Sequence, residues 1–294
     1  MKIIVSILLL VMGLAAKAQY PAALPSSGPL STDMIKDWMY AAGEITFAEY
    51  SGATSLAFLN SKSHLTDKTA PYSISDWYGY SVFVFNVTLT VNTSQYNVKT
   101  AAIAAGWDQT NPLLATVTIN TGVVVYSAAG SGVAAFNTGS TFPVGSSMTI
   151  INKGSIVGYS GLGAAYGSAG NGSAGGWAVE THINITINNT NGNIYGGGGG
   201  GGGGGNNALG GGGGTGGNGA GAGPGGLISA TGGGAPGLLA GAGGAGGGYG
   251  ASGSTGIMGA LGAPGSGGAG GAATSSAGYT ITWTGTGTRL GTIG

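Results

Sequence analysis

The chain has 294 residues, of which 68 are glycine and only 5% are charged, and its formal net charge is zero. A surface without net charge argues against nucleic acid as a partner, because phosphate binding needs a basic face. Disorder goes with low hydrophobicity and high net charge, whereas 42% of these residues are hydrophobic. Because the chain has no cysteine, disulfides, thiolate metal sites and cysteine nucleophiles are excluded.

Residues 1–18 have the pattern of a signal peptide. Lys2 precedes an apolar run from Ile3 to Leu14, and Ala16-Lys17-Ala18 has the small-x-small spacing of a cleavage site before Gln19. The apolar run is shorter than the roughly 20 residues that a spanning helix needs. Cleavage after Ala18 is therefore predicted, and retention of the segment as an apolar anchor is the alternative.

Residues 19–80 hold most of the charge, and aromatic residues recur beside carboxylates. Thr32 or Asp33 is expected to cap a short helix that runs through Tyr40. The acidic and aromatic pairs predict a small mixed docking region at the N-terminus. Its candidate docking residues are Trp38, Trp77 and Tyr78. A small ordinary core with carboxylates on its surface is the competing interpretation.

Residues 81–195 are predicted to form a β-rich stem. Threonine alternates with isoleucine or valine in four similar segments, at uneven intervals close to the period of a solenoid. Such alternation places an apolar face inward and a hydroxyl face outward. We expect stacked β layers, either a β-sandwich or a short β-solenoid. The four segments are residues 88–92, 116–120, 148–152 and 185–188.

Residues 196–275 are glycine-rich and open with ten glycines in a row, Gly196 to Gly205. A flexible linker is one interpretation, since glycine loses the most backbone entropy when it is ordered. The other is a bundle of polyglycine-II helices, which have three residues per turn and no internal hydrogen bonds. Apolar residues recur through the zone, and a strand is expected after it within residues 276–294. The ordered bundle is therefore preferred.

No group of residues with catalytic spacing stands out. Glu180 and His182 are expected on one face of a strand, where a structural surface pair is preferred to a metal pair. The sequence has no zinc-ligand spacing, calcium loop, nucleophile elbow or phosphate loop. It therefore predicts a protein that is not an enzyme and that uses no cofactor and no metal.

Recognition is expected in the glycine-rich zone, because binding residues commonly lie on loops that a rigid scaffold presents. The candidate receptor contacts are non-glycine residues expected in its turns. For each of them the alternative is that it only caps the end of the bundle. The candidates are Asn206, Asn207, Leu209, Leu227, Ile228, Leu238, Leu239, Tyr249, Ile257 and Met258.

Five segments occur in an order that resembles phage tail-fibre proteins. They are PSSGPLS at residues 25–31, APYSISDWYG at 70–79, MTIINKGSIVG at 148–158, NNTNGNIYG at 188–196, and the C-terminal ITW and GTRLG at 281–283 and 287–291. The chain is also similar to the T-even-type tail-fibre adhesins. In those proteins a polyglycine-II sandwich presents variable loops to outer-membrane proteins or lipopolysaccharide.

The resemblance implies a viral adhesin at the tip of a tail fibre or spike, which binds a host cell-surface receptor, either an outer-membrane protein or a glycan. Other virion fibre or spike proteins are the implied partners, and self-association is left open. The expected location is the virion surface or the extracellular space. A signal peptide departs from the pattern of phage tail proteins. A bacterial secreted glycine-rich matrix protein and an ice-binding protein stay as alternative functions.

Overall fold

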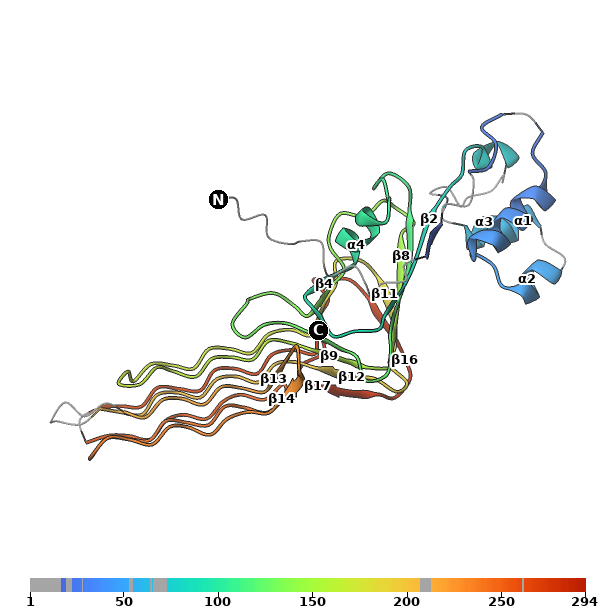
Figure 1. The fold of residues 1–294 in the computed structure, drawn as a ribbon. Coiled ribbons are helices and arrows are strands. Elements are labelled where there is room, and N and C mark those ends of the chain that lie inside the picture. The colour runs from blue at the N-terminus through green and yellow to red at the C-terminus, as the bar shows by residue number, and fades with distance from the viewer. Residues whose placement is uncertain are drawn as a thin grey trace, which may run out of the picture.

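The computed structural model describes residues 23–27, 29–52, 55–63, 65, 73–206, 213–260 and 262–294, and the backbone of residues 17–19. Three parts follow one another along the molecule: a small helical region, a three-sided β-solenoid and a bundle of extended glycine-rich segments (Figure 1). The signal peptide stays a prediction, because residues 1–16 lie outside this description. Cleavage after Ala18 would cut strand β1 (Lys17–Gln19). None of the described helices has the length and apolarity needed to cross a membrane.

The helical region contains three short α-helices and one 3-10 helix. They are α1 (Thr32–Ala42), α2 (Phe47–Ser51), α3 (Leu56–Lys62) and η1 (Ile74–Trp77). Helix α1 is the one predicted, but its N-cap is Ser31, whose hydroxyl accepts a hydrogen bond from the Met34 N–H. Ile35, Met39, Leu59 and Trp77 form the centre of a core that is separate from that of the solenoid.

Glu49 joins helices α2 and α3. Its carboxylate accepts a hydrogen bond from the Thr46 N–H in a capping box at the start of α2. The same carboxylate lies 2.6 Å from Lys62 Nζ at the end of α3. The hydrogen bond with Lys62, followed by those with Thr46, lowers the pKa of Glu49 to about 2. The charged form of Glu49 therefore stabilises the folded helical region.

The solenoid is built from successive coils. Each of the first four adds one strand to each of three sheets, and the last adds a strand to the first two. In the long sheet the strands after β1 are parallel: β2 (Phe83–Leu89), β5 (Leu113–Ile119), β8 (Ser147–Asn152), β11 (Ile185–Asn188) and β16 (Ile281–Thr284). The second sheet contains β3 (Thr93–Ser94), β6 (Val124–Tyr126), β9 (Ser155–Val157), β12 (Asn193–Tyr195) and β17 (Thr288–Leu290). The third contains β4 (Tyr96–Asn97), β7 (Phe136–Asn137), β10 (Val179–Glu180) and β15 (Thr274–Ser275).

Equivalent residues of successive coils stack in register. Inside the long sheet, one row runs through Val87, Val117, Ile150, Ile187 and Trp283. The alternating threonines point away from this core, as the sequence pattern predicts. Parallel pairing in register makes the stem a solenoid, and the sandwich expected as its alternative is not formed. The structure adds helix α4 (Val98–Ala104) after the first coil, which the sequence did not predict.

The glycine-rich segments are connections between the second and third sheets of the solenoid. In the first coil this connection is Gln95 alone, and in the next three coils it consists of residues 127–135, 158–178 and 196–273. The last of these includes a hairpin of β13 (Gly221–Gly223) and β14 (Gly226–Ile228). The predicted boundary between stem and glycine-rich zone at residue 196 therefore leaves out one part of the bundle. Residues 158–178 run in the bundle and not in the stem.

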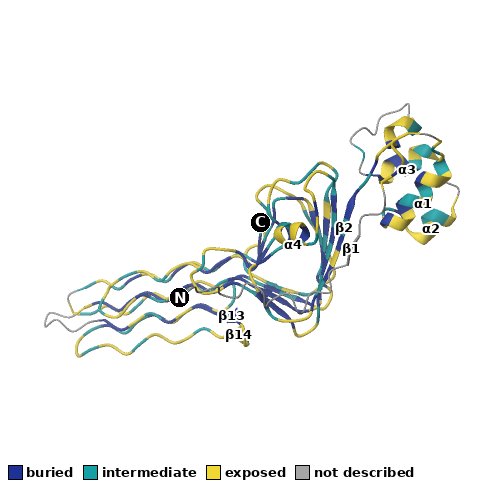
Figure 2. Cartoon of the chain, turned by 45° about the horizontal axis from the view of Figure 1, so that its top comes forward, coloured by how far each residue is buried: buried dark blue, intermediate teal, exposed yellow. Residues whose placement is uncertain are grey.

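The ten consecutive glycines form the central segment of the bundle, and all ten are buried (Figure 2). The N–H groups of Gly197, Gly200 and Gly203 donate to successive carbonyls of residues 170–176. The glycines on the other two sides donate to residues 214–220 and 251–257. Their carbonyls accept from residues 161–164, 241–250 and 265–271. Six neighbouring segments thus pair with the central one, and a disordered linker is ruled out for the described part.

The close approach of these segments leaves no room for a side chain in the centre. A Cβ on Gly200 would lie 2.0 Å from the carbonyl oxygen of Leu162, and one on Gly201 would lie 2.0 Å from that of Gly244. In the outer segments 241–247 and 265–271 only every third residue is buried, so Ala245 and Ser266 are tolerated where the chain faces solvent. This explains why glycine is continuous in one segment and periodic in the others.

Replacing Gly200 with alanine should destabilise the bundle by at least about 1–3 kcal/mol, because the added methyl group meets backbone that cannot move aside. The matched control is Gly232→Ala, since a Cβ there has no atom within 4 Å. Thermal unfolding of both full-length variants measures the difference. Equal melting temperatures would contradict the close packing described here.

Acid should weaken the helical region before the bundle. The folded-state pKa of Glu49 is about 2 against an ordinary value of 4.5. Its contribution is therefore present above pH 4.5 and is lost as the pH falls toward 2. The bundle has no formally charged residue between Glu180 and Arg289. Circular dichroism at 222 nm should show a decline of helix between pH 5 and 2.5, and Glu49→Gln should reduce the dependence on pH. A pH response unchanged by that substitution would assign it to other groups.

Candidate functional site

Four turns lie at the end of the bundle farthest from the solenoid (Figure 1). Their position follows from the pairing of the central segment, since Gly196 follows directly on β12 while Gly205 is nine residues further out. Gly205 donates to the carbonyl of Ile257 and accepts from Gly241, so the chain reverses just beyond these residues. The described residues of these turns are 165–169, Asn206 with Gly213, 237–240, and 258–260 with 262–263.

Large apolar side chains are exposed on these turns. Leu238 is 82% exposed, Met258 71% and Leu239 65%, and Ile257 beside them is also exposed. Asn206 lies at the same end, where its Oδ1 accepts a hydrogen bond from the Gly213 N–H at 3.0 Å. Exposed apolar groups gathered in one place mark an interaction site more often than scattered ones do. These five predicted contact residues therefore lie together.

Leu239 adopts a left-handed backbone conformation, with φ of 59°. This conformation costs a non-glycine residue roughly 1–2 kcal/mol. Glycine would avoid the cost, and the surrounding chain uses glycine freely. An exposed leucine in such a turn gains nothing from burial inside its own chain. Backbone strain of this kind is found preferentially at functional sites.

Three of the predicted contacts lie at the opposite end, next to the solenoid. Leu227 and Ile228 belong to β14, and the hairpin packs through Ala222 on the outer face of the second sheet. Asn92 also donates to the carbonyl of Pro224 at the tip of the hairpin. Tyr249 stacks on Tyr195 at 4.7 Å, and its hydroxyl donates to the carbonyl of Gly221. Ala222 and Tyr249 thus hold the base of the bundle against the solenoid, and the exposed Leu227 and Ile228 lie at this base and not in the tip.

Two other candidates, Asn207 and Leu209, lie outside the described residues. Conversely, the structure adds Tyr166, which is 61% exposed on the first of the four turns. Sequence reasoning assigned this residue to the stem. The signal was present nonetheless, because glycines at residues 161, 163, 167, 170, 172, 175 and 176 approach the spacing of the later segments.

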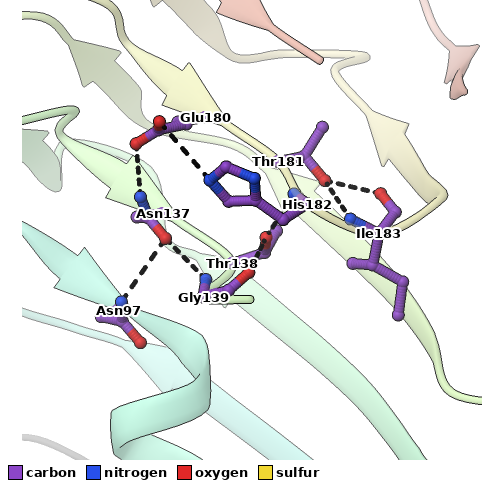
Figure 3. A network of polar contacts seen from close by, with 8 residues as sticks. All are labelled: Asn97, Asn137, Thr138, Gly139, Glu180, Thr181, His182 and Ile183. Atoms are coloured by element: carbon purple, nitrogen blue, oxygen red, sulfur yellow. Dashed lines mark hydrogen bonds and ion pairs between the residues drawn. The ribbon is translucent and has the colours of Figure 1, made fainter. Parts of the chain in front are cut away.

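The Glu180–His182 pair belongs to a row of polar residues on the outer side of the third sheet (Figure 3). Glu180 Oε1 lies 3.5 Å from His182 Nε2, and Oε2 accepts a hydrogen bond from Asn137. Asn137 in turn accepts from the Gly139 N–H and from Asn97. No cluster of three or more metal-binding side chains occurs among the described residues. The contacts support the structural interpretation of this pair.

The predicted docking residues differ in exposure. Trp77 is buried in the core of the helical region, where its ring lies 5.2 Å from that of Tyr80, so it supports the fold and offers no surface. Trp38 is half-buried against Tyr80, and Tyr78 is exposed. Sequence reasoning did not single out the aromatic patch of Tyr40, Phe47 and Tyr50. In this patch Tyr40 stacks on Tyr50 at 4.7 Å and contacts Phe47.

Comparison with known proteins adds to this geometry. A chain in the crystal structure of the gp37–gp38 adhesin tip complex of the bacteriophage S16 long tail fiber has the same fold, with a TM-score of 0.52 and 21% sequence identity. The likeness covers 91% of this chain and 99% of that chain. No curated protein sequence matches this chain. The sequence model of a family described as phage tail fibre adhesin Gp38 matches residues 84–294, which is well over half of the chain. The protein therefore belongs to the phage tail fibre adhesin Gp38 family.

Proposed function

We propose that the far-end turns of the bundle bind the host receptor, an outer-membrane protein or a glycan, when the phage attaches. The exposed cluster of Leu238, Leu239, Ile257 and Met258 carries this proposal. Burying one such side chain at an interface contributes roughly 1.5–3 kcal/mol. The turns project from a scaffold whose central segment is hydrogen-bonded to six neighbouring segments. Such a scaffold reduces the ordering that binding would otherwise cost.

We further infer that the glycine-rich segments are polyglycine-II helices. The direction of each N–H group repeats after three residues along Gly196–Gly205, as a helix with three residues per turn requires. Among the described residues, the backbone hydrogen bonds of the central segment go to other segments, which fits a helix without internal hydrogen bonds. Each helix alone would be unstable, and the pairing of neighbours supplies the missing partners.

The helical region is proposed as the part that docks on another tail-fibre protein. The structural relative comes from a complex of two tail-fibre proteins, gp37 and gp38. In this chain the aromatic patch of Tyr40, Phe47 and Tyr50 and the nearby exposed residues of α1 offer a surface of the composition that stable interfaces use. Docking at one end of the molecule leaves the far-end turns free to reach the host.

Binding without catalysis is the proposed chemistry. The carboxylates of the solenoid and the helical region have structural partners, as Glu49 and Glu180 show. Membership of an adhesin family favours attachment over the matrix and ice-binding alternatives. The virion surface is the location that this membership implies.

Exchange of Leu238 and Leu239 for aspartate should abolish adsorption to host cells, because two carboxylates would replace the most exposed part of the apolar cluster. The matched control is Leu227→Asp with Ile228→Asp, which places the same charges on exposed leucine and isoleucine at the base of the bundle. Adsorption of the full-length proteins to a panel of bacterial strains is the measurement. Undiminished adsorption of the first variant, or equal loss in both, would refute the assignment of the tip.

Replacement of Phe47 with serine should weaken docking on the partner fibre protein without loss of receptor binding. Phe47 is 68% exposed and no residue of the core rests on it, so the helical region should keep its stability. Co-purification with the partner fibre protein tests the first point and adsorption of the isolated adhesin tests the second. Normal assembly of Phe47→Ser together with Tyr40→Ser would place docking elsewhere.

A further inference from the structure

The outer face of the long sheet carries a continuous row of polar side chains. Asn86, Thr116, Thr149, Thr186 and Thr282 occupy the same register position on five successive parallel strands. Neighbouring strands in a sheet are about 4.7–4.9 Å apart. A hydrogen-bonding group therefore recurs at that spacing along a straight line across the solenoid.

The side chains of this row are available to a ligand. All five are at least partly exposed, and none of their side chains makes a hydrogen bond within the described part of the protein. A threonine hydroxyl both donates and accepts, and an asparagine amide does the same. Buried polar side chains are satisfied internally, as Asn152 and Asn189 are at the corner of the solenoid. The outer row lacks such partners.

The row lies in a groove that crosses the strands. At one end the groove is bounded by Gly43 and Glu44 of the helical region, which stand over Thr116 and Thr149. An adjoining hollow, which shares Thr149 with the first, continues over Thr186 and Thr282. A third hollow extends from Asn184 to Tyr279, beside the start of the last strand of the sheet. Tyr279 is 44% exposed, so part of its ring faces solvent. The lining residues between the two ends carry no formal charge.

We propose that this groove binds a neutral polysaccharide chain that lies across the strands. A glycan presents hydroxyl groups at every sugar unit, and the strand spacing is close to the length of one pyranose unit along such a chain. Hydroxyls that donate and accept can satisfy both kinds of group on a sugar. The uncharged row gives no reason to prefer an anionic polymer, and Glu44 at one end disfavours it. The exposed ring of Tyr279 supplies an apolar face for the C–H groups of a terminal unit.

This site is separate from the far-end turns and goes beyond the receptor proposed for them. Each contact along the row is weak, since a hydrogen bond contributes little net free energy when water competes. Several weak contacts in a line nevertheless hold a polymer that offers many equivalent positions. Such binding would retain the adhesin in a glycan layer while its tip searches for the receptor.

The test uses the full chain in affinity electrophoresis through gels that contain dextran, a neutral mannan or, as the charged probe, polygalacturonate. At least one neutral polymer should retard the protein more than the charged one. Thr149→Val together with Thr186→Val should lower the association constant about ten-fold, because two hydroxyls are lost from the row. Valine keeps the β-branched shape that suits a strand, so the fold is preserved. The matched control is Thr118→Val, which removes an outward hydroxyl of the same sheet outside the groove.

Four outcomes would overturn the proposal. The first two are no retardation by either neutral polymer and stronger retardation by polygalacturonate. The third is an equal loss of polysaccharide binding in Thr118→Val. The fourth is thermal hysteresis that depends on Thr149 and Thr186, which would make the row an ice-binding surface. If the pair of valines lowers the melting temperature, Thr282→Val on the edge strand replaces it. A fifth outcome against the groove, loss of polysaccharide binding in the Leu238→Asp and Leu239→Asp variant, would move the glycan site to the tip. That result would leave the proposed receptor function standing.

Discussion

Hydrogen bonds between backbone groups of different glycine segments are the interaction on which the adhesin tip depends. The central segment, Gly196–Gly205, buries its entire backbone, and each N–H and C=O group left without a partner there would be costly. Those partners come from six surrounding segments, which must approach so closely that a Cβ would overlap a carbonyl oxygen. The central segment therefore requires glycine because no Cβ fits between the packed backbones. The loss of backbone entropy on ordering so many glycines is opposed by the gain of paired backbone groups.

The solenoid provides the geometry that such pairing needs. Its coils place the start of each connection about 4.8 Å from the next, because the connections leave from neighbouring parallel strands. Residues 158–178 and 196–273 thus begin side by side and can pair from their first residues, as the bond from the Gly158 N–H to the Tyr195 carbonyl shows. Tyr249 and the β13–β14 hairpin then fix the base of the bundle on the second sheet. The solenoid and the bundle therefore form one continuous hydrogen-bonded structure.

Function is distributed along the length of the molecule. The helical region presents an aromatic patch at one end, and the far-end turns present aliphatic side chains at the other. Between them lies the uncharged groove of the long sheet, with its row of hydroxyls. The near absence of charge suits this arrangement. Long-range electrostatic attraction is screened by salt and would not distinguish one bacterial surface from another. In the proposed function, selectivity would depend on shape and on short-range contacts such as those of Leu238 and Met258.

The sequence by itself predicted the β-rich stem and favoured an ordered glycine zone, because both depend on local periodicity, whereas the adhesin family was indicated by the resemblance of five segments. Threonine alternating with isoleucine predicted which side of each strand would be buried, and five ordered segments carried the resemblance. The tertiary structure alone decided that residues 158–178 join the bundle, that Tyr166 lies in the tip and that Tyr249 does not. Ser31 as the cap of α1 and the burial of Trp77 were also settled there. These points depend on how many segments surround each residue and at which end a turn falls, and neither is encoded in the local spacing of side chains.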